Sequence, residues 1–246
     1  MKKSDLRKVL ADIFDPSVLT TELPKHELNK PPSLKDIESL ASLIAEEKEE
    51  ESFQQFLSKN PHFLFRLTPS SDDTVLGFLN KPPISNFNIA DFGIYIVNQG
   101  GCRVFLIEIE RPSDKLFTKA LTPAKKLQVA LGQIHDWNEW LQTNRETFVR
   151  SSFKILKESP RFPKKRKNGS FIYCSPEHLE GSWAGFGGDH FCTFEYLILI
   201  GRWSKLSERE KNRLVYYNRS YESQNIKIRT YDNFIRKAIE GPRFFW

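Results

Sequence analysis

Three carboxylates stand at the ends of two consecutive apolar segments near the middle of the chain. Asp91 opens the first segment, and the second contains Glu108 and is followed at once by Glu110. β-branched and aromatic residues crowd both segments, and Gly100-Gly101 lies between them, which predicts two strands joined by a tight turn. Clustered carboxylates are unfavourable unless something positive holds them together, so the pattern predicts a divalent cation bound by oxygen ligands.

The spacing of the two glutamates indicates where they point. Residues two apart in a strand lie on the same face of a sheet, and Asp91 would lie on the neighbouring strand. An alternative places Glu108 and Glu110 in solvent at a strand end. Their apolar neighbours instead favour a buried pair, which needs a partner; these neighbours are Phe105, Leu106, Ile107 and Ile109.

A helix is predicted to follow the two strands, because apolar residues recur at helical spacing over residues 123–141. Gln133 lies in its middle among apolar residues, and Trp137 follows one turn later. Such a glutamine can position a nucleotide or a metal-bound water, and the alternative is a hydrogen bond between helices. Acid, acid-x-acid and then a helical Gln-x-x-x-aromatic motif is the order of parts in a metal-dependent nuclease core.

Several segments follow one another in an order that is more specific than any one of them. They are Ser52-Phe-Gln-Gln-Phe-Leu-Ser-Lys-Asn-Pro61, Ala90-Asp91-Phe92, Ile107-Glu-Ile-Glu-Arg-Pro112, Gly132-Gln133-Ile-His-Asp-Trp137, Leu199-Ile-Gly-Arg202 and Ile228-Arg-Thr-Tyr-Asp232. The ordered set resembles the PD-(D/E)XK nuclease superfamily, and within it the Shedu type of bacterial anti-phage defence nuclease.

The resemblance implies a fold, an activity and a set of site residues. The fold is an α/β restriction-endonuclease-like core, with a central mixed β-sheet flanked by helices. The activity is DNA cleavage with Mg²⁺ or Mn²⁺, with Asp91, Glu108 and Glu110 as catalytic metal ligands and Gln133 as a further catalytic residue. Defence against phage or other foreign DNA, and assembly into a homo-oligomer (a dimer or tetramer), are also implied.

One more metal ligand is expected from the acidic run that precedes the first segment. The resemblance points to Glu51, whereas helical phase places Glu49 and Glu50 nearer the apolar face formed by Phe53 and Phe56. Most of this run is expected to be ordinary solvated surface.

The chain departs from the superfamily pattern at two positions. Glu110 stands where a lysine usually orients and deprotonates the attacking water, and Trp137 stands where a tyrosine is usual. Lys125 or Lys126 could reach the same space from the following helix, with Lys119 as a weaker candidate, and Lys125 is the one assigned to the catalytic set. Otherwise a second metal ion would activate the water, or activity would be low or lost.

A basic loop is the expected DNA contact. The chain has a formal net charge of +6 and a pI near 9.1, which suits a polyanionic partner. Residues 160–170 are basic and rich in turn formers, with Phe162 interleaved, and could clamp a phosphate backbone. A mobile, solvated loop is the alternative. The expected contacts are Arg161, Lys164, Lys165, Arg166 and Lys167.

The rest of the pattern places these parts in one large domain. Residues 1–35 form an N-terminal extension with a short helix over 6–13, and residues 36–246 form the nuclease domain. Helices are expected over 34–58, ended by Asn60-Pro61, and over 233–240, capped by Asp232. Strands are expected over 63–67, 194–201 and 226–230, and residues 69–83 are expected to be loop with some extended structure.

The cysteines and termini favour a cytoplasmic protein with no membrane contact. The three cysteines form no close pair, and neither a signal peptide nor an apolar run of membrane-spanning length is present. Zinc is an alternative at two pairs with tolerable or unusual spacing, Cys174/His178 and His190/Cys192. The glycine-rich residues 185–188 lack the Lys-Ser/Thr of a P-loop, so no nucleotide cofactor is expected.

Three functions remain in view. A metal-dependent endonuclease is favoured, followed by a catalytically decayed nuclease fold that binds DNA. The third is an interaction protein whose acidic and basic segments serve assembly.

Overall fold

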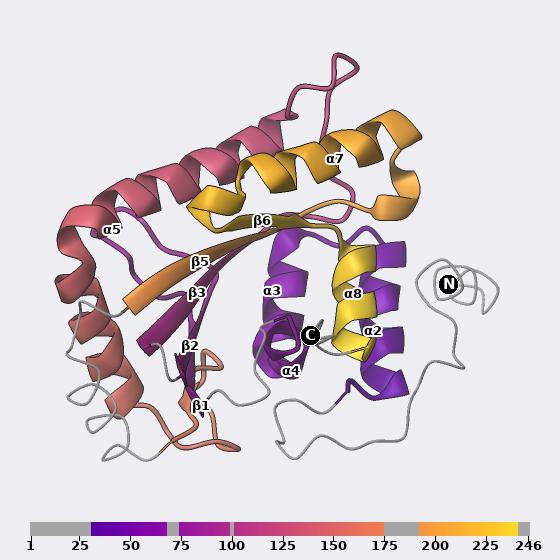
Figure 1. Cartoon of the computed structure of the whole chain (residues 1–246). Coiled ribbons are helices and arrows are strands. Elements are labelled where there is room, and N and C mark those ends of the chain that lie inside the picture. The colour runs from indigo at the N-terminus through magenta and orange to yellow at the C-terminus, as the bar shows by residue number, and fades with distance from the viewer. Residues whose placement is uncertain (1–30, 68–73, 99–100, 175–191, 241–246) are drawn as a thin grey trace.

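A six-stranded mixed sheet forms the middle layer of the protein, and helices cover both of its faces (Figure 1). The computed structural model describes residues 31–67, 74–98, 101–174 and 192–240. The strand order in the sheet is β4-β1-β2-β3-β5-β6. The strands are β1 Thr74–Asn80, β2 Phe92–Asn98, β3 Gly101–Ile109, β4 Phe171–Ile172, β5 Cys192–Leu199 and β6 Ile226–Arg229. The predicted α/β class with a central mixed sheet is confirmed.

The sheet is antiparallel at one end and parallel at the other. Strands β4, β1, β2 and β3 pair antiparallel in that order, so that β2 and β3 form the predicted hairpin. Strand β5 is parallel to β3, and β6 is parallel to β5. Parallel neighbours need a crossover connection, and the helix α5, Lys125–Lys157, is part of the one between β3 and β5.

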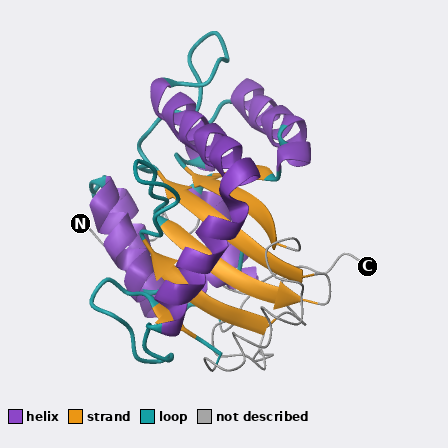
Figure 2. Ribbon diagram, turned by 90° about the vertical axis from the view of Figure 1, so that its left-hand side faces the viewer, coloured by secondary structure: helices purple, strands orange, loops and turns teal. Residues whose placement is uncertain are grey.

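Alternation along each strand determines which helices cover each face of the sheet. In β2, Ile94 packs with α2 Leu34–Ala45, α3 Glu50–Lys59, α4 His62–Phe65 and α8 Tyr231–Glu240. Its neighbour Tyr95 packs on the opposite face with α5 and α7, Glu208–Ser220. Figure 2 shows the strands between these two helical layers. Short 3₁₀ turns, Trp203–Lys205 and Glu222–Gln224, flank α7.

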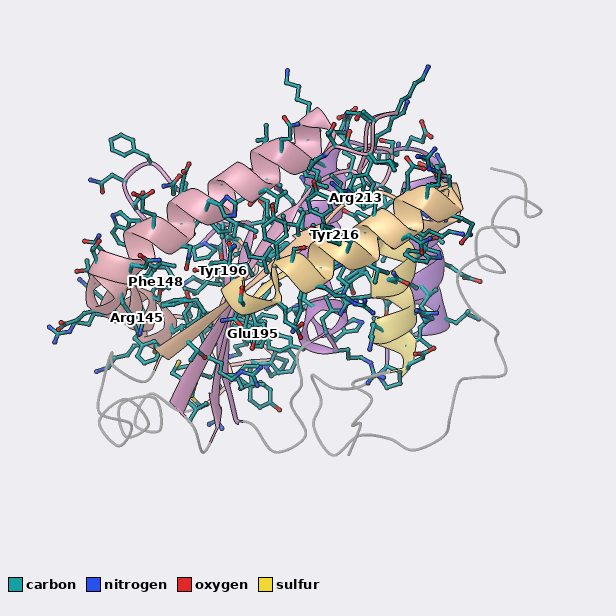
Figure 3. The ribbon with its side chains drawn as sticks, turned by 45° about the horizontal axis from the view of Figure 1, so that its top comes forward. Arg145, Phe148, Glu195, Tyr196, Arg213 and Tyr216 are labelled. Carbon is teal, nitrogen blue, oxygen red and sulfur yellow. The ribbon has the colours of Figure 1, made fainter. Side chains whose placement is uncertain are left out.

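Helix α5 is fixed to the sheet by aromatic side chains of β5 (Figure 3). The Tyr196 hydroxyl lies 3.1 Å from the Asn138 Oδ1 of α5. The Phe148 ring meets the Phe194 ring edge to face at 5.7 Å between centroids. Helix α5 bends at Asn144, whose φ of −119° is not helical, and then continues along the sheet. The predicted helix over 123–141 is therefore the first part of a longer one.

Two helices begin with capping boxes. In α2 the Ser33 side chain accepts from the Asp36 N–H while the Asp36 carboxylate accepts from the Ser33 N–H. Ser207 and Glu210 do the same at the start of α7. Each box satisfies two N–H groups that a helix start leaves without partners.

One element prediction is wrong, and it concerns a short apolar run. Residues 63–67 were expected as a strand, but Phe63, Leu64 and Phe65 belong to the helix α4, where all three are buried. A short run buried all round shows neither period, so the pattern cannot separate strand from helix. Residues 74–80 form β1, within the stretch expected to be loop with some extended structure, and its register with β2 is irregular between Val75 and Gly77.

The expected cap of the last helix is also corrected. Helix α8 begins at Tyr231, so Asp232 lies inside its first turn. The Asp232 carboxylate instead accepts from Arg202 Nε at 2.9 Å and from the Trp203 N–H at 2.6 Å. The helix predicted over 34–58 is divided into α2 and α3, and the one predicted over residues 6–13 lies outside the described residues. None of the helices in the described ranges is both long and apolar enough to cross a lipid bilayer.

Two glycines provide a matched test of the packing around the end of β5. Gly201 has a φ of +63°, and a Cβ there would lie 2.8 Å from the Asp114 carbonyl oxygen and collide with the Leu116 side chain. We expect Gly201→Ala to lower the free energy of unfolding by about 1–3 kcal/mol. Gly132→Ala, in α5 with open space around the new methyl, should raise it by about 0.5–1 kcal/mol. Urea unfolding measures both, and a neutral Gly201→Ala would contradict the packing described.

Candidate active site

Hairpin pairing brings Asp91 to the end of β3. Phe92 pairs with Ile107, so the residue before β2 lies beside the last residues of β3. The Asp91 N–H donates to the Ile107 carbonyl at 3.0 Å, and the Ile109 N–H donates to Asp91 Oδ2 at 2.8 Å. The backbone of β3 therefore fixes the Asp91 side chain, which is 5% exposed.

Glu108 and Glu110 lie beside Asp91 and are buried as well, at 8% and 3% exposure. Glu108 pairs with Ile198, which packs with α5, so the glutamate shares the α5 face of the sheet. Glu110 follows the strand and is held by its own backbone. Its N–H donates to the Leu199 carbonyl at 2.8 Å, and its carbonyl accepts from the Tyr231 hydroxyl at 2.9 Å.

Two lysines approach these acids from different directions. Lys81, which follows β1, lies 2.7 Å from Asp91 Oδ1. Lys126, the second residue of α5, lies 2.8 Å from Glu110 Oε2. Their side chains are 49% and 45% exposed, so each cation sits at the solvent edge of a buried carboxylate.

Helix α3 contributes a fourth acid from the opposite helical layer. Gln54 donates to Asp91 Oδ1 at 2.7 Å and to Glu50 Oε1 at 2.9 Å. Lys126 lies 3.9 Å from Glu50 Oε2. The helix acid that joins the cluster is therefore Glu50, as helical phase allowed, whereas Glu51 is exposed and accepts from Gln55 at 3.2 Å.

The remaining acid of this run points elsewhere. Glu49 precedes α3 and is 79% exposed, and its carboxylate lies 3.1 Å from the Arg111 guanidinium. The Arg111 side chain also pairs with Asp114 at 3.1 Å. These contacts hold the turn after β3 against the start of α3.

The electrostatics of the cluster show an excess of negative charge. Burial, with Asp91 and Glu110 close by, raises the pKa of Glu108 to about 9. Burial and the same two carboxylates raise the pKa of Glu50 to about 7. Burial also raises the pKa of Glu110, although Lys126 opposes the shift. Four carboxylates face two ammonium groups, so the cluster favours protons or an added cation.

The donor set suits a hard divalent cation, because carboxylate oxygens are the ligands that Mg²⁺ and Mn²⁺ prefer. Within the described ranges, however, no three His, Cys, Asp or Glu side chains are arranged to hold a metal ion. Lys81 and Gln54 contact one oxygen of Asp91, the Ile109 N–H contacts the other, and Lys126 contacts Glu110. The lysines thus stand where a cation would neutralise the acids, and a metal ion would displace them.

The other predicted catalytic residues lie further along α5 or in solvent. Gln133 is half-buried two turns after Lys126, and none of the hydrogen bonds described joins it to the acids. Trp137 is buried in the α5 layer. Lys125 and Lys119 are both exposed, and neither makes an ion pair with any described residue. The lysine that the fold brings to the acids is therefore Lys126.

Two cations of the basic loop are used by the protein itself. Lys165 donates to the Lys59 carbonyl at 2.8 Å, and burial lowers its pKa. Arg166 lies 3.8 Å from a Glu158 carboxylate oxygen. The other three cations are exposed, and these are Arg161, Lys164 and Lys167.

Sequence reasoning missed Gln54 and Lys81 as parts of the site. Gln54 lies within the resembling segment but was not singled out, and its spacing of four from Glu50 on a helix was the available signal. Lys81 has no local signal. It reaches Asp91 only because β1 pairs with β2, with the Lys81 N–H donating to the Asp91 carbonyl at 2.9 Å.

The last two segments that carry the family resemblance, residues 199–202 and 228–232, meet next to the acids. Arg202 and Asp232 form a buried ion pair in which Arg202 contacts Asp232 Oδ1 at 2.8 Å. The Gly201 N–H donates to the Arg111 carbonyl at 3.1 Å, which ties the end of β5 to the turn after Glu110. These contacts hold the turn after β3 against the end of β5.

The alternative zinc site falls partly outside the described residues. Cys174 and Cys192 are buried and free, and Cys192 lies opposite Cys102 in the sheet. His178 and His190 are not among the described residues, nor are the glycines at 185–188.

A mixed sheet between two helical layers, with acids gathered at the ends of its central strands, is consistent with a nuclease-like core. The family model for the C-terminal region of the Shedu protein SduA matches residues 47–235. The chain therefore belongs to the Shedu family. No curated protein matches it.

The raised pKa of Glu108 predicts a pH dependence of stability in protein stripped of metal with EDTA. The folded protein keeps a proton on Glu108 up to a pH of about 9, whereas the unfolded chain releases it near the ordinary value of 4.5. The free energy of unfolding should therefore fall as pH rises between these values. Glu108→Gln should flatten the fall and be more stable than the parent at its alkaline end.

Urea unfolding at a series of pH values measures this dependence. Glu51→Gln is the control, because Glu51 is exposed and lies outside the cluster. Identical pH slopes in the parent and in Glu108→Gln would show that the proton on Glu108 does not cause the pH dependence of stability.

Proposed function

We propose that this protein is a metal-dependent DNA endonuclease of the Shedu type that hydrolyses phosphodiester bonds in bacterial defence against phage or other foreign DNA. Membership of the Shedu family supports the class of activity. The observation that carries the chemistry is the cluster of Asp91, Glu108, Glu110 and Glu50, whose four carboxyl groups outnumber the two lysines beside it.

Hydrolysis of a phosphodiester needs charge neutralisation, an oriented water and a proton acceptor. A bound Mg²⁺ or Mn²⁺, held by Asp91, Glu108 and Glu110, would supply the neutralisation and a more acidic water. Within the chain, the Ile109 N–H fixes the orientation of Asp91. Glu50, with a pKa of about 7, is suited to accept and release a proton at neutral pH.

Lys126 replaces the lysine that the superfamily usually carries at the position of Glu110. It comes from α5 instead of β3, but it reaches the same acids, at 2.8 Å from Glu110. Its hydrogen bond to Glu110 raises its pKa, so it remains a cation at neutral pH. We assign it to orienting the water and stabilising the charge that develops on the phosphate, a role that needs a fixed donor more than a base.

The expected partners complete the proposal. The net charge of +6 and the exposed cations Arg161, Lys164 and Lys167 support binding to a DNA backbone. Assembly into a dimer or tetramer and a cytoplasmic location remain proposals that follow from the family resemblance and from the cysteine pattern. Gln133, Lys125 and Glu51 are not assigned a catalytic role on the geometry described.

A second candidate is a catalytically decayed nuclease fold that serves in DNA binding or assembly. One observation favours it, namely that Lys81 and Lys126 contact carboxylates that a metal ion would need. One comparison separates the two candidates. The decayed protein would bind DNA in EDTA, but it would not cleave DNA when any divalent cation is added.

We expect Asp91→Asn and Glu108→Gln each to abolish cleavage of plasmid DNA in Mg²⁺ or Mn²⁺. Both changes keep the size of the side chain and remove the negative charge that a cation needs. Agarose gels measure cleavage, and thermal unfolding checks that each variant is folded. Glu51→Gln is the matched control and should cleave as the parent does. Parental activity in Asp91→Asn or Glu108→Gln would move the active site elsewhere.

The assignment of Lys126 has its own matched control in its neighbour. Lys126→Met should lower the cleavage rate by roughly 10²–10⁴, the range for a lost acid-base or orienting partner. Lys125→Met removes the same charge from the same helix turn but not from the acids, and should change the rate far less. DNA affinity in EDTA should change little in either variant. Equal rates in the two variants would leave a second metal ion as the explanation.

A further inference from the structure

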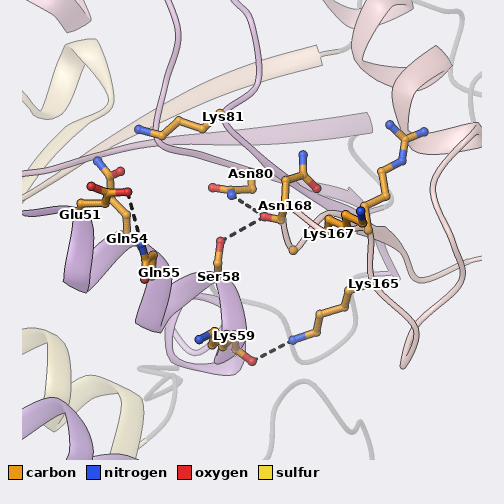
Figure 4. A pocket seen from close by; sticks show the side chains of 12 residues that line it. Glu51, Gln54, Gln55, Ser58, Lys59, Asn80, Lys81, Lys165, Lys167 and Asn168 are labelled. Carbon is orange, nitrogen blue, oxygen red and sulfur yellow. Dashed lines mark hydrogen bonds between the residues drawn. The ribbon is translucent and has the colours of Figure 1, made fainter.

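A groove of about 530 Å³ lies beside the acid cluster (Figure 4). One wall is α3, with Gln55 and Lys59, and another is the segment Asn80-Lys81 that follows β1. The third is the loop that carries Lys167 and ends at Gly169. These segments are far apart in sequence, so the groove exists only in the folded protein.

The groove opens directly onto the candidate active site. Gln54 and Lys81 both line it, and each lies 2.7 Å from Asp91 Oδ1. A ligand that fills the groove would therefore contact two side chains that hydrogen-bond Asp91. Lys81 is half-exposed and can turn from Asp91 toward an anion in the groove.

The floor of the groove is held in place by hydrogen bonds between its walls. The Asn168 carbonyl accepts from the Ser58 hydroxyl at 3.3 Å and from the Asn80 side chain. Gly169 has a φ of +92°, and a Cβ there would lie 3.0–3.1 Å from Ser58 atoms. The tip of the basic loop is thus fixed to both α3 and β1, and the groove is preformed.

The lining is cationic and rich in side-chain amides. Five cations and one carboxylate, Glu51, line it. Lys59 and Lys167 are exposed and form no ion pair with any described residue, so both are available to phosphates. The amides belong to Gln54, Gln55, Asn80 and Asn168. Amides supply both donors and acceptors, as the edges of bases require.

We infer that this groove binds unpaired nucleotides of the DNA strand next to the bond that is cut. The inference rests on the proposed nuclease function and adds the form of the substrate. A groove of this volume is in the size range of small-molecule sites, so one strand fits while a duplex can contact only its rim. In this arrangement Lys59 and Lys167 form ion pairs with phosphates, and Gln55 forms a hydrogen bond with the edge of a base. Lys81 contacts the strand beside Asp91.

Fluorescence anisotropy in EDTA tests the inference without cleavage. The probes are a labelled oligo-dT strand and a labelled blunt hairpin duplex, each titrated over a range of salt concentrations. The double variant Lys59→Gln/Lys167→Gln should weaken the single strand by about tenfold and the duplex far less, and it should lower the salt slope for the strand by about 0.7 per lost contact. Gln55→Ala should weaken the strand without changing that slope.

The control removes two exposed lysine charges that do not line the groove. Lys35→Gln/Lys154→Gln, on α2 and α5, should leave the affinity for the strand unchanged. Equal losses for strand and duplex in the groove variant, equal losses in the two double variants, or no loss at all would each overturn the inference. Because metal is absent, a protein that binds the strand here but never cleaves would overturn the nuclease proposal alone.

Discussion

The Asp91 carboxylate is the point on which the candidate site depends. One of its oxygens accepts from the Ile109 N–H, and the other accepts from Gln54 and Lys81. The first contact continues the β2–β3 ladder past the start of β2, so Asp91 is fixed by the same pairing that builds the sheet. The second set joins it to α3 and to the residue after β1. Displacing this side chain would loosen strand, helix and groove together.

The buried negative charge explains why elements from both helical layers converge here. Burial and the neighbouring carboxylates raise the pKa values of Glu50, Glu108 and Glu110, so the cluster requires cations or protons. Lys126 comes from α5 on one face, and Gln54 comes from α3 on the other. Both arrive at the strand ends, where the sheet no longer separates the layers. Such a site opposes folding stability and is maintained by the packing around it.

The position of the lysine is informative about how a nuclease-like core tolerates change. In this chain Glu110 follows β3 where the superfamily usually has a lysine, and the positive charge comes from the start of α5. A cation lies at the acids in this chain, and α5 supplies it instead of β3. The Lys126 side chain is 45% exposed, so its ammonium group lies where Glu110 meets solvent.

Local signals in the sequence determined the hairpin, the acids on it and several helix boundaries. The apolar runs beside Asp91 and Glu108 need only neighbouring residues to be recognised, and the capping boxes at Ser33 and Ser207 are equally local. The burial of the acids also followed from their apolar neighbours. The family resemblance rested on the order of such local segments, and the match over residues 47–235 agrees with it.

Tertiary structure alone decided which residues complete the site. Glu50 lies at the acids where Glu51 was expected, and Lys126 lies there where Lys125 was expected. Neighbouring residues on a helix point about 100° apart, and packing determines which of them faces the site. Lys81 contacts Asp91 because β1 pairs with β2. Asp232 left its expected cap because a buried Arg202 lay within reach. In each case the deciding contact joins residues distant in sequence, and no local pattern encodes it.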